Sequence, residues 1–154
     1  MLLAYLQMLK IRGFTFVLKY FINAHLFDLV HKVDTHRWFK KYQKGKEVKS
    51  KNYKHGVLYM PTWTCVINNA FKILTTNEDL NSYTFIDVGC GKGKVLIQWF
   101  ILMSKKSIHM YLIGVEYDKH LSEICKRNLS ILKMAAKVKV QNIDITNVKF
   151  NQIG

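Results

Sequence analysis

The sequence has little proline, little cysteine and few acidic residues. Pro61 is the only proline among 154 residues, so no proline-rich linker divides the chain. The three cysteines, Cys65, Cys90 and Cys125, are far apart and lack C-x-x-C spacing. This pattern disfavours a disulfide framework and a metal site, and favours the reducing cytoplasm. With 49% hydrophobic and 22% charged residues, the chain can fold as one domain around an apolar core.

Acidic residues are scarce beside basic ones. The chain holds 24 Lys and Arg against 10 Asp and Glu, for a formal net charge of +14. Most of the excess precedes residue 78, and between residues 31 and 54 lysines alternate with aromatic residues. Such a surface either keeps the protein in solution or attracts an anionic partner: nucleic acid, anionic lipid or an acidic protein. Both interpretations stay open. For residues 31–54, a flap that covers a ligand is a third interpretation.

The first 30 residues are strongly apolar but contain no uninterrupted run as long as a membrane span. Lys10, Arg12 and Lys19 break the run before it reaches the ~20 residues that a transmembrane helix needs. We expect a pair of helices packed on the sheet of the following domain, with a break at Gly13. Because no acid precedes Asp28, a presequence or a helix lying on a membrane surface is the alternative. The expected location is the cytoplasm, with membrane association as the second interpretation.

A glycine-rich turn, Asp87-Val88-Gly89-Cys90-Gly91-Lys92-Gly93-Lys94, is the most informative stretch. Apolar runs on both sides predict a strand before it and a helix after it, which is how an α/β fold opens a nucleotide pocket. Glycines permit unusual φ angles and let the backbone approach a ligand closely. A dinucleotide-binding G-x-G-x-x-G turn would need glycine at position 94, where this chain has Lys94. A nicotinamide-dependent reductase is therefore disfavoured.

Two further strands are predicted after the turn, and each ends in an acidic residue. Residues 108–115 are apolar and rich in β-favouring side chains, and Glu116 follows them. Residues 137–144 alternate between polar and apolar and end at Asp144. The intervening residues 118–134 have apolar side chains at helical spacing. This order predicts an α/β fold with a β-α-β-α-β unit.

Three carboxylates are thus expected at one edge of the sheet. Asp87, Glu116 and Asp144 each end a predicted strand, and Asp118 is placed to cap the helix between the last two strands. Each acid alone is more often a solvated strand end. Together, behind a glycine-rich turn, they indicate a binding site, because ligands of such folds lie at the carboxyl ends of parallel strands.

The acid followed by G-x-G-x-G is similar to motif I of class I S-adenosylmethionine (SAM)-dependent methyltransferases. This resemblance implies a Rossmann-like methyltransferase sheet, SAM as cofactor and transfer of its methyl group to an unidentified acceptor. The basic N-terminal region favours a protein or another macromolecule as that acceptor. It also implies that Asp87 lies near the methionine amino group or positions the turn, that Glu116 holds the ribose and that Asp144 holds the adenine. The cofactor-binding residues implied here are Asp87, Gly89, Cys90, Gly91, Gly93, Glu116, Tyr117 and Asp144.

A second element of the resemblance precedes the turn. Residues 56–63 read G-V-L-Y-M-P-T-W and lead into a helix predicted over residues 63–75, with Thr62 as its N-cap. Some small bacterial class I methyltransferases and some protein-lysine methyltransferases outside the SET class carry a similar Tyr-x-Pro-Thr/Ser element, which closes over the methionine end of SAM. By resemblance, Tyr59 and Thr62 line the cofactor pocket; by the simpler interpretation, they form a turn and a cap.

The resemblance covers roughly residues 57–150 and only the cofactor half of the family's fold. Class I sheets have seven strands and this sequence supplies three, with no Asn-Pro or Asp-Pro motif to face an acceptor. We expect a basic helical extension over residues 1–55 and a SAM-binding half-domain over residues 56–154. The missing strands indicate either a piece of a longer enzyme or a half-domain that self-associates through an unpaired sheet edge. No catalytic base can be named, and a non-catalytic module held at an anionic membrane or nucleic acid is the alternative to an enzyme.

Overall fold

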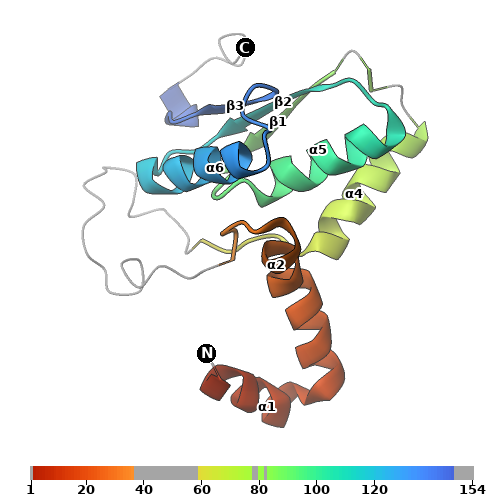
Figure 1. Cartoon of the computed structure of the whole chain (residues 1–154), viewed down its shortest axis with the longest axis vertical. Coiled ribbons are helices and arrows are strands. Elements are labelled where there is room, and N and C mark those ends of the chain that lie inside the picture. Colours follow the sequence, from red (N-terminus) through yellow and green to blue (C-terminus); the bar gives the residue numbers. More distant parts are fainter. Residues whose placement is uncertain (1, 37–58, 78–79, 82, 148–154) are drawn as a thin grey trace.

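A parallel three-stranded sheet with helices against one face forms the body of the molecule (Figure 1). The computed structural model describes residues 2–36, 59–77, 80–81 and 83–147. The strands are β1 (Thr84–Val88), β2 (Tyr111–Val115) and β3 (Val138–Gln141), hydrogen-bonded in the order β1-β2-β3. Because both pairings are parallel, all three carboxyl ends lie at one edge. The predicted β-α-β-α-β arrangement is confirmed.

Three helices cover the sheet face that carries Phe85, Leu112 and Val138. Helices α5 (Lys94–Lys106) and α6 (Lys119–Ile131) make the two crossovers, and α4 (Thr64–Asn77) packs beside α5 (Figure 1). The predicted cap of α6 is confirmed, since the Asp118 carboxylate accepts the backbone N–H of Leu121 at 2.9 Å.

The start of β2 lies three residues later than predicted. The chain leaves α5 through Ser107, which adopts a left-handed φ of 56° and donates its N–H to the Met103 carbonyl. Ile108 donates to the same carbonyl, and His109 donates to the Asn81 side chain at 2.9 Å. The N–H groups of residues 107 and 108 are thus used at the end of α5 and that of His109 is used by Asn81, so they are not available to the hydrogen bonds between β1 and β2.

The end of β3 lies three residues before Asp144, where the sequence predicted it. Oδ1 of Asp144 accepts both the N–H and the hydroxyl of Thr146, at 3.0 and 2.7 Å. This side-chain cap turns the chain into a short 3₁₀ helix, η3 (Ile145–Asn147). Local capping therefore ends the strand before its alternating pattern does.

The predicted N-cap of α4 at Thr62 is wrong. The helix starts at Thr64, and the Trp63 carbonyl accepts the N–H groups of Val66 and Ile67. Trp63 therefore holds the capping position, while Thr62 lies one residue further out and is exposed.

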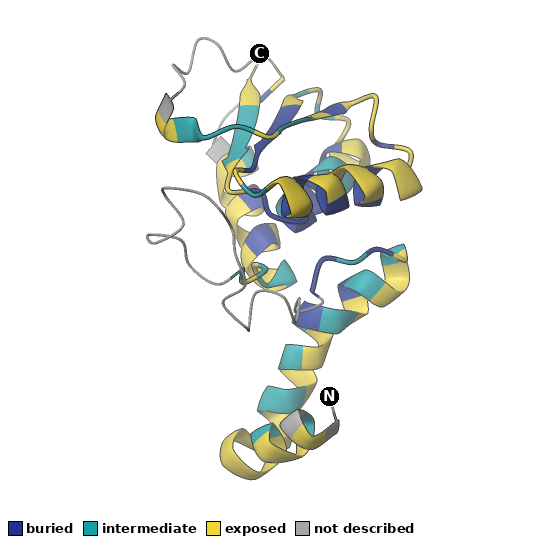
Figure 2. Cartoon of the chain, turned by 90° about the vertical axis from the view of Figure 1, so that its left-hand side faces the viewer, coloured by how far each residue is buried: buried dark blue, intermediate teal, exposed yellow. Residues whose placement is uncertain are grey.

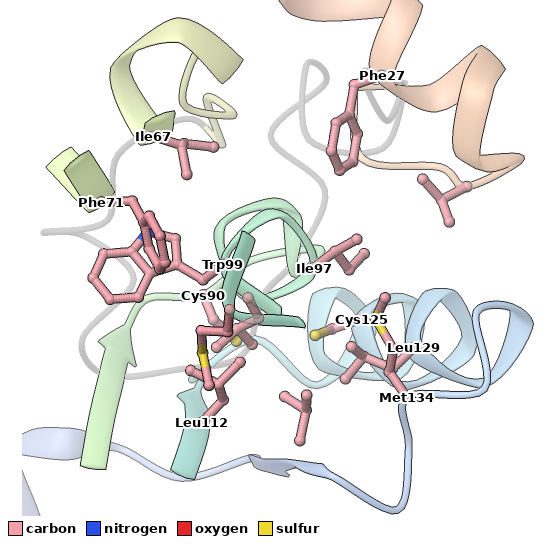
Figure 3. Packing of buried hydrophobic residues seen from close by; sticks show 14 residues of the cluster. Phe27, Ile67, Phe71, Cys90, Ile97, Trp99, Leu112, Cys125, Leu129 and Met134 are labelled. Carbon is pink, nitrogen blue, oxygen red and sulfur yellow. The ribbon is translucent and has the colours of Figure 1, made fainter. Parts of the chain in front are cut away.

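One apolar core lies between the helices and the sheet, and Figure 3 shows how its members converge. Trp99 of α5 is its aromatic centre. Its ring stacks on Phe85 of β1, with centroids 3.9 Å apart, and meets Phe71 of α4 edge-on at 5.2 Å. Leu96 and Ile97 on the same helix are fully buried. The core thus fixes α4 and α5 against β1, immediately beneath the glycine turn.

The N-terminal segment is helical, as predicted, and breaks at Gly13. Helix α1 (Leu2–Phe21) is kinked there, with φ 77° and ψ 168°. A π-helical turn η1 (Ile22–Leu26) and helix α2 (Phe27–His31) follow. The predicted packing of these helices on the sheet is wrong: η1 contacts α4, and α1 extends away from the sheet (Figure 1). Only Phe27 and Val33 from this region enter the core cluster.

No helix in the described part of the chain combines the length and apolar character needed to cross a bilayer. The predicted boundary between residues 55 and 56, and the basic aromatic stretch from residue 37 onwards, lie outside the described residues.

We expect Trp99→Ala to lower the free energy of unfolding by about 3–5 kcal/mol, because it removes a buried aromatic side chain and its stacking partner contacts. Ile73→Ala on α4 is the control; its side chain is 66% exposed, so the change should stay within about 0.5 kcal/mol. Urea unfolding followed by circular dichroism measures both. Equal effects of the two substitutions would contradict the core described here.

Candidate functional site at the glycine turn

The glycine turn, defined here as Gly89–Gly93, joins β1 to α5 at the carboxyl edge of the sheet. Gly89, Gly91 and Gly93 all adopt left-handed φ angles, of 76°, 54° and 84°. The N–H groups of Gly89 and Cys90 donate to the Val115 carbonyl at the end of β2. The spacing of the glycines is thus a backbone requirement, since other residues adopt such angles only at a cost.

Two of the glycines are also needed because neighbours occupy the space of a side chain. A Cβ on Gly91 would fall 2.2 Å from the Tyr59 ring, and one on Gly93 would fall 2.5 Å from the Cys125 sulfur. Gly89 differs, because nothing lies within 4 Å of where its Cβ would be. The turn is therefore enclosed on two sides and open at Gly89.

Glu116 joins the end of β2 to the glycine turn. The side chain is only 8% exposed. One carboxylate oxygen accepts the Gly91 N–H and the other accepts the Asp118 N–H, both at 2.8 Å. Burial raises the pKa of this carboxyl, and the two N–H donors act against that rise. A carboxylate has about four acceptor positions, so each oxygen keeps capacity for a further donor such as a hydroxyl.

Asp87 lies on β1 next to the turn, in the field of Glu116. Burial, together with the Glu116 charge, raises the pKa of the Asp87 carboxyl to about 6. Within the described part of the chain no hydrogen bond reaches this carboxylate. A half-buried acid in this state favours a nearby cation, because a positive charge would offset both causes of the shift.

Asp144 and Tyr117 lie further along the same edge. The Asp144 carboxylate caps Thr146, so at least one of its oxygens serves the local structure. Tyr117 follows Glu116 and is exposed. Asn142, which the sequence did not single out, donates to the Glu116 and Tyr117 carbonyls at 2.7 and 2.9 Å. It fixes the backbone on which the Glu116 carboxylate is mounted.

Cys90 points away from the open side of the turn. Its sulfur lies 2.8 Å from the position that a Cβ on Gly114 of β2 would take. Its side chain is buried in the core with Leu112 (Figure 3). Its neighbour Cys125, together with burial, raises the pKa of the Cys90 thiol. Only the backbone of Cys90 is placed to approach a ligand.

Tyr59 lies against the turn, whereas Thr62 is exposed. The Tyr59 hydroxyl donates to the Thr35 carbonyl at 2.8 Å, and its ring packs over Gly91. Thr35 is held in turn by Asp28, whose carboxylate accepts its N–H and hydroxyl and the N–H of His36. We call residues 33–36 the strap, because this segment connects α2 to the turn.

Two lysines of the glycine motif bind the N-terminal region. Lys92 is fully buried, and its ammonium pairs with Asp34 of the strap at 3.1 Å. The Lys94 ammonium donates to the Asn23 carbonyl at 2.6 Å, and burial lowers its pKa to about 8. Asn128 of α6 completes the junction by bonding the Asp34 backbone and the Lys92 carbonyl.

These strap residues were not predicted from the sequence. Lys92 and Asn128, which bond to Asp34, lie 58 and 94 residues away from it in the sequence. No local sequence pattern indicates contacts over such separations. The lysines within the glycine motif were the only feature of the sequence that indicated such contacts, since a buried lysine needs a hydrogen-bond acceptor.

The geometry of the turn fits a small cationic ligand with hydroxyl groups. The open backbone at Gly89 permits close approach, Asp87 offers a carboxylate for a cation, and Glu116 offers further acceptor positions. Among the described residues no three His, Cys, Asp or Glu side chains gather to hold a metal ion. The carboxylate oxygens of Asp87 and Glu116 are acceptors that suit an amino group and ribose hydroxyls, which SAM carries.

No model of a protein family matches the sequence, and no curated protein matches it significantly. Solved structures of methyltransferases are similar to it. One is an RNA methyltransferase from Salinibacter ruber in complex with S-adenosyl-L-homocysteine, with 18% identity and a TM-score of 0.45 over 58% of this chain. Another is a SAM-dependent methyltransferase from Thiobacillus denitrificans with the same ligand, with 19% identity and a TM-score of 0.42 over 60% of this chain.

A third is a SAM-dependent methyltransferase, described as such provisionally, from Methanococcus maripaludis, with 16% identity and a TM-score of 0.40 over 60% of this chain. The matched regions cover 53%, 34% and 48% of the three solved chains, in the order given. This chain thus spans about half of their length or less.

We expect Gly91→Ala to destabilise the protein more than Gly89→Ala. Both substitutions place alanine at a left-handed φ, at a cost of about 1–2 kcal/mol. Only the first drives a methyl group into the Tyr59 ring, which adds about 1–3 kcal/mol. Thermal unfolding of the two variants measures the difference.

The double variant Gly91→Ala/Tyr59→Ala tests the cause. It should be less destabilised than the sum of its two single variants, because removing the ring removes the clash. Strict additivity would contradict the contact between Tyr59 and the turn.

Proposed function

We propose that the chain binds SAM at the glycine turn and takes part in methyl transfer to a macromolecular acceptor. The observation that carries this proposal is the open, left-handed backbone of Gly89, which follows Asp87 by two residues and precedes Gly91, whose N–H the Glu116 carboxylate accepts. Left-handed glycines alone fit many nucleotide-binding turns. Two neighbouring acids, both with a raised pKa, favour a ligand that carries a positive charge and hydroxyl groups.

Each residue of the edge has a distinct part in this proposal. Asp87 in its ionised form would hold the methionine ammonium group, and Glu116 would accept from ribose hydroxyls while it keeps the Gly91 N–H. The exposed Tyr117 and the Asp144 carboxyl would border the adenine. Tyr59, fixed through Thr35, would close the turn from the side of the strap.

SAM, when bound, supplies a methyl group already activated by its sulfonium. The protein is then needed chiefly for proximity, orientation and exclusion of water. The residues described here hold the ligand rather than the acceptor, and no residue is assigned as a base. The basic excess before residue 78 favours an anionic macromolecule, or a protein with an acidic surface, as the acceptor.

Calorimetric titration with SAM and with S-adenosylhomocysteine tests the cofactor. We expect saturable binding that Glu116→Ala weakens by about tenfold or more, because hydroxyl acceptors and the support of Gly91 are lost together. Glu123→Ala, which removes an exposed carboxylate on α6, is the matched control and should bind as the wild type does. Equal affinities of all three proteins, or tighter binding of a nicotinamide nucleotide, would reject the assignment.

The affinity for SAM should rise as pH rises through about 6, because the pKa of Asp87 is raised to about 6 and only the ionised carboxylate attracts an ammonium group. Asp87→Asn should bind more weakly and without this pH dependence. Titrations across this pH range compare the two proteins. A wild-type affinity that does not change with pH would contradict the role given to Asp87.

Stability should change in the opposite direction. The folded protein holds the Asp87 proton more tightly than the unfolded chain does, so the contribution of this group to stability falls as pH rises from about 4 to about 6. The loss is on the order of 3 kcal/mol at most. Without ligand, Asp87→Asn should therefore unfold at a higher denaturant concentration than the wild type at neutral pH, and show no such difference at acid pH.

Transfer itself is tested with SAM that carries a radioactive methyl group. Protein and RNA fractions of a cell extract are incubated with the chain or with its Glu116→Ala variant. Label that accumulates in one fraction with the wild type alone would support transfer and identify the class of acceptor. SAM binding without any label would restrict the proposal to cofactor binding.

A further inference from the structure

Helix α1 carries the largest group of exposed apolar side chains in the described part of the chain. Leu3, Ile11 and Phe14 are 74%, 76% and 70% exposed. Figure 2 shows this helix extending away from the sheet with most of its surface in the exposed colour. Single exposed apolar residues are ordinary, but a contiguous group of this size marks an interaction surface.

Beyond the kink at Gly13 the exposed apolar residues follow a helical spacing. Phe14, Leu18 and Phe21 are related by i, i+4 and i+7, so they share one face of the helix. The opposite face packs inward, where Phe16 and Tyr20 lie 6.3 and 6.4 Å from the Trp63 ring. The inner face thus anchors α1 to the start of α4, and the outer apolar face is presented to a partner.

The arm before the kink repeats this division. Tyr5 turns inward, with its ring 6.1 Å from Tyr20 and 5.8 Å from His25. The apolar side chains on the outside of this arm are Leu3, Leu6, Leu9 and Ile11. Exposed apolar side chains thus occur on both arms of the kinked helix, which is more than the single stripe that a helix-binding groove accepts.

The charged side chains of α1 itself all have one sign. Lys10, Arg12 and Lys19 are exposed on α1, and the chain has no acidic residue before Asp28. Long basic side chains can extend from an apolar surface to reach phosphate groups. A helix that combines exposed apolar side chains with cations and carries no acid is complementary to a bilayer that contains anionic lipid.

We propose that α1 lies in the plane of an anionic membrane surface, with its outer apolar face inserted and Lys10, Arg12 and Lys19 on lipid phosphates. Because η1 and the strap are bonded to Lys94 and Lys92, docking of α1 holds the glycine turn close to the membrane. This proposal does not depend on methyl transfer, and a chain that failed to bind SAM could still dock.

Flotation of the full chain with vesicles tests the proposal. One set of vesicles contains equal parts of phosphatidylcholine and phosphatidylserine, and the other contains phosphatidylcholine alone. We expect binding to the anionic set that weakens at high salt. Phe14→Glu/Leu18→Glu should lower the partition coefficient by about tenfold or more, because it places carboxylates on the inserted face.

The matched control lies on α4. Ile73 and Leu74 are 66% and 44% exposed, close to the 70% and 46% of Phe14 and Leu18, so Ile73→Glu/Leu74→Glu adds the same charge at equal exposure away from α1. It should bind vesicles nearly as the wild type does. Replacing Lys10, Arg12 and Lys19 with Gln should lower binding to anionic vesicles by about fivefold for each cation, and this variant leaves the apolar face unchanged.

Absence of wild-type binding to anionic vesicles would overturn the proposal, as would equal losses in the α1 and α4 variants. A dimer in gel filtration that the α1 substitutions abolish, without vesicle binding, would assign the surface to a second copy of the chain instead. Far-ultraviolet circular dichroism establishes that each variant is folded. If Phe14→Glu/Leu18→Glu does not fold, the glutamine variant and the salt dependence still decide.

Discussion

The lack of space around the glycine turn is the constraint on which the rest of the site depends. Tyr59 fills the volume next to Gly91, and Cys125 fills the volume next to Gly93. Glu116 draws the turn against the end of β2 through the Gly91 N–H. The turn is thus fixed by a segment before β1, by α6 and by β2. Of the three glycines, Gly89 alone has open space where a Cβ would be, and it lies two residues after Asp87.

The same constraint explains why an N-terminal segment that is remote in sequence belongs to the site. Tyr59 keeps its position because Thr35 accepts its hydroxyl, and Thr35 keeps its position because Asp28 binds it. The buried Lys92 ammonium also joins the strap to the turn, through its ion pair with Asp34. A buried ion pair of this kind adds little net stability, since desolvation of both charges opposes their attraction. Its consequence is geometric: the strap and the turn hold one relative position.

The sequence was sufficient for the type and order of the elements from β1 to β3, because those depend on local patterns. Apolar runs, glycine spacing and the Asp118 cap all act within a few residues, and the structure confirms the strand order they predicted. The failures are also physical. Thr62 is a residue type that favours the N-cap, but Trp63 holds that position in the structure. Strands β2 and β3 are shorter than predicted because Ser107 and Asp144 make local hydrogen bonds next to them. The strap could not be predicted, since Asp34 meets Lys92 and Asn128 only after the chain has folded.

The charges of the molecule have an uneven arrangement that bears on its chemistry. The chain has a net charge of +14, yet the edge beside Gly89 presents two carboxylates whose pKa values are raised by burial and, for Asp87, by the neighbouring Glu116. Two acids held in this way destabilise the folded state at neutral pH, and a structure optimised for stability alone would not keep them together. Such a cost is expected where a bound cation relieves it, because the interaction that weakens the free protein then strengthens the complex. The larger part of the basic excess precedes residue 78, and Lys92 and Lys94 of the glycine motif are occupied by Asp34 and the Asn23 carbonyl, so attraction of a cationic cofactor by the two carboxylates is compatible with attraction of an anionic surface by α1.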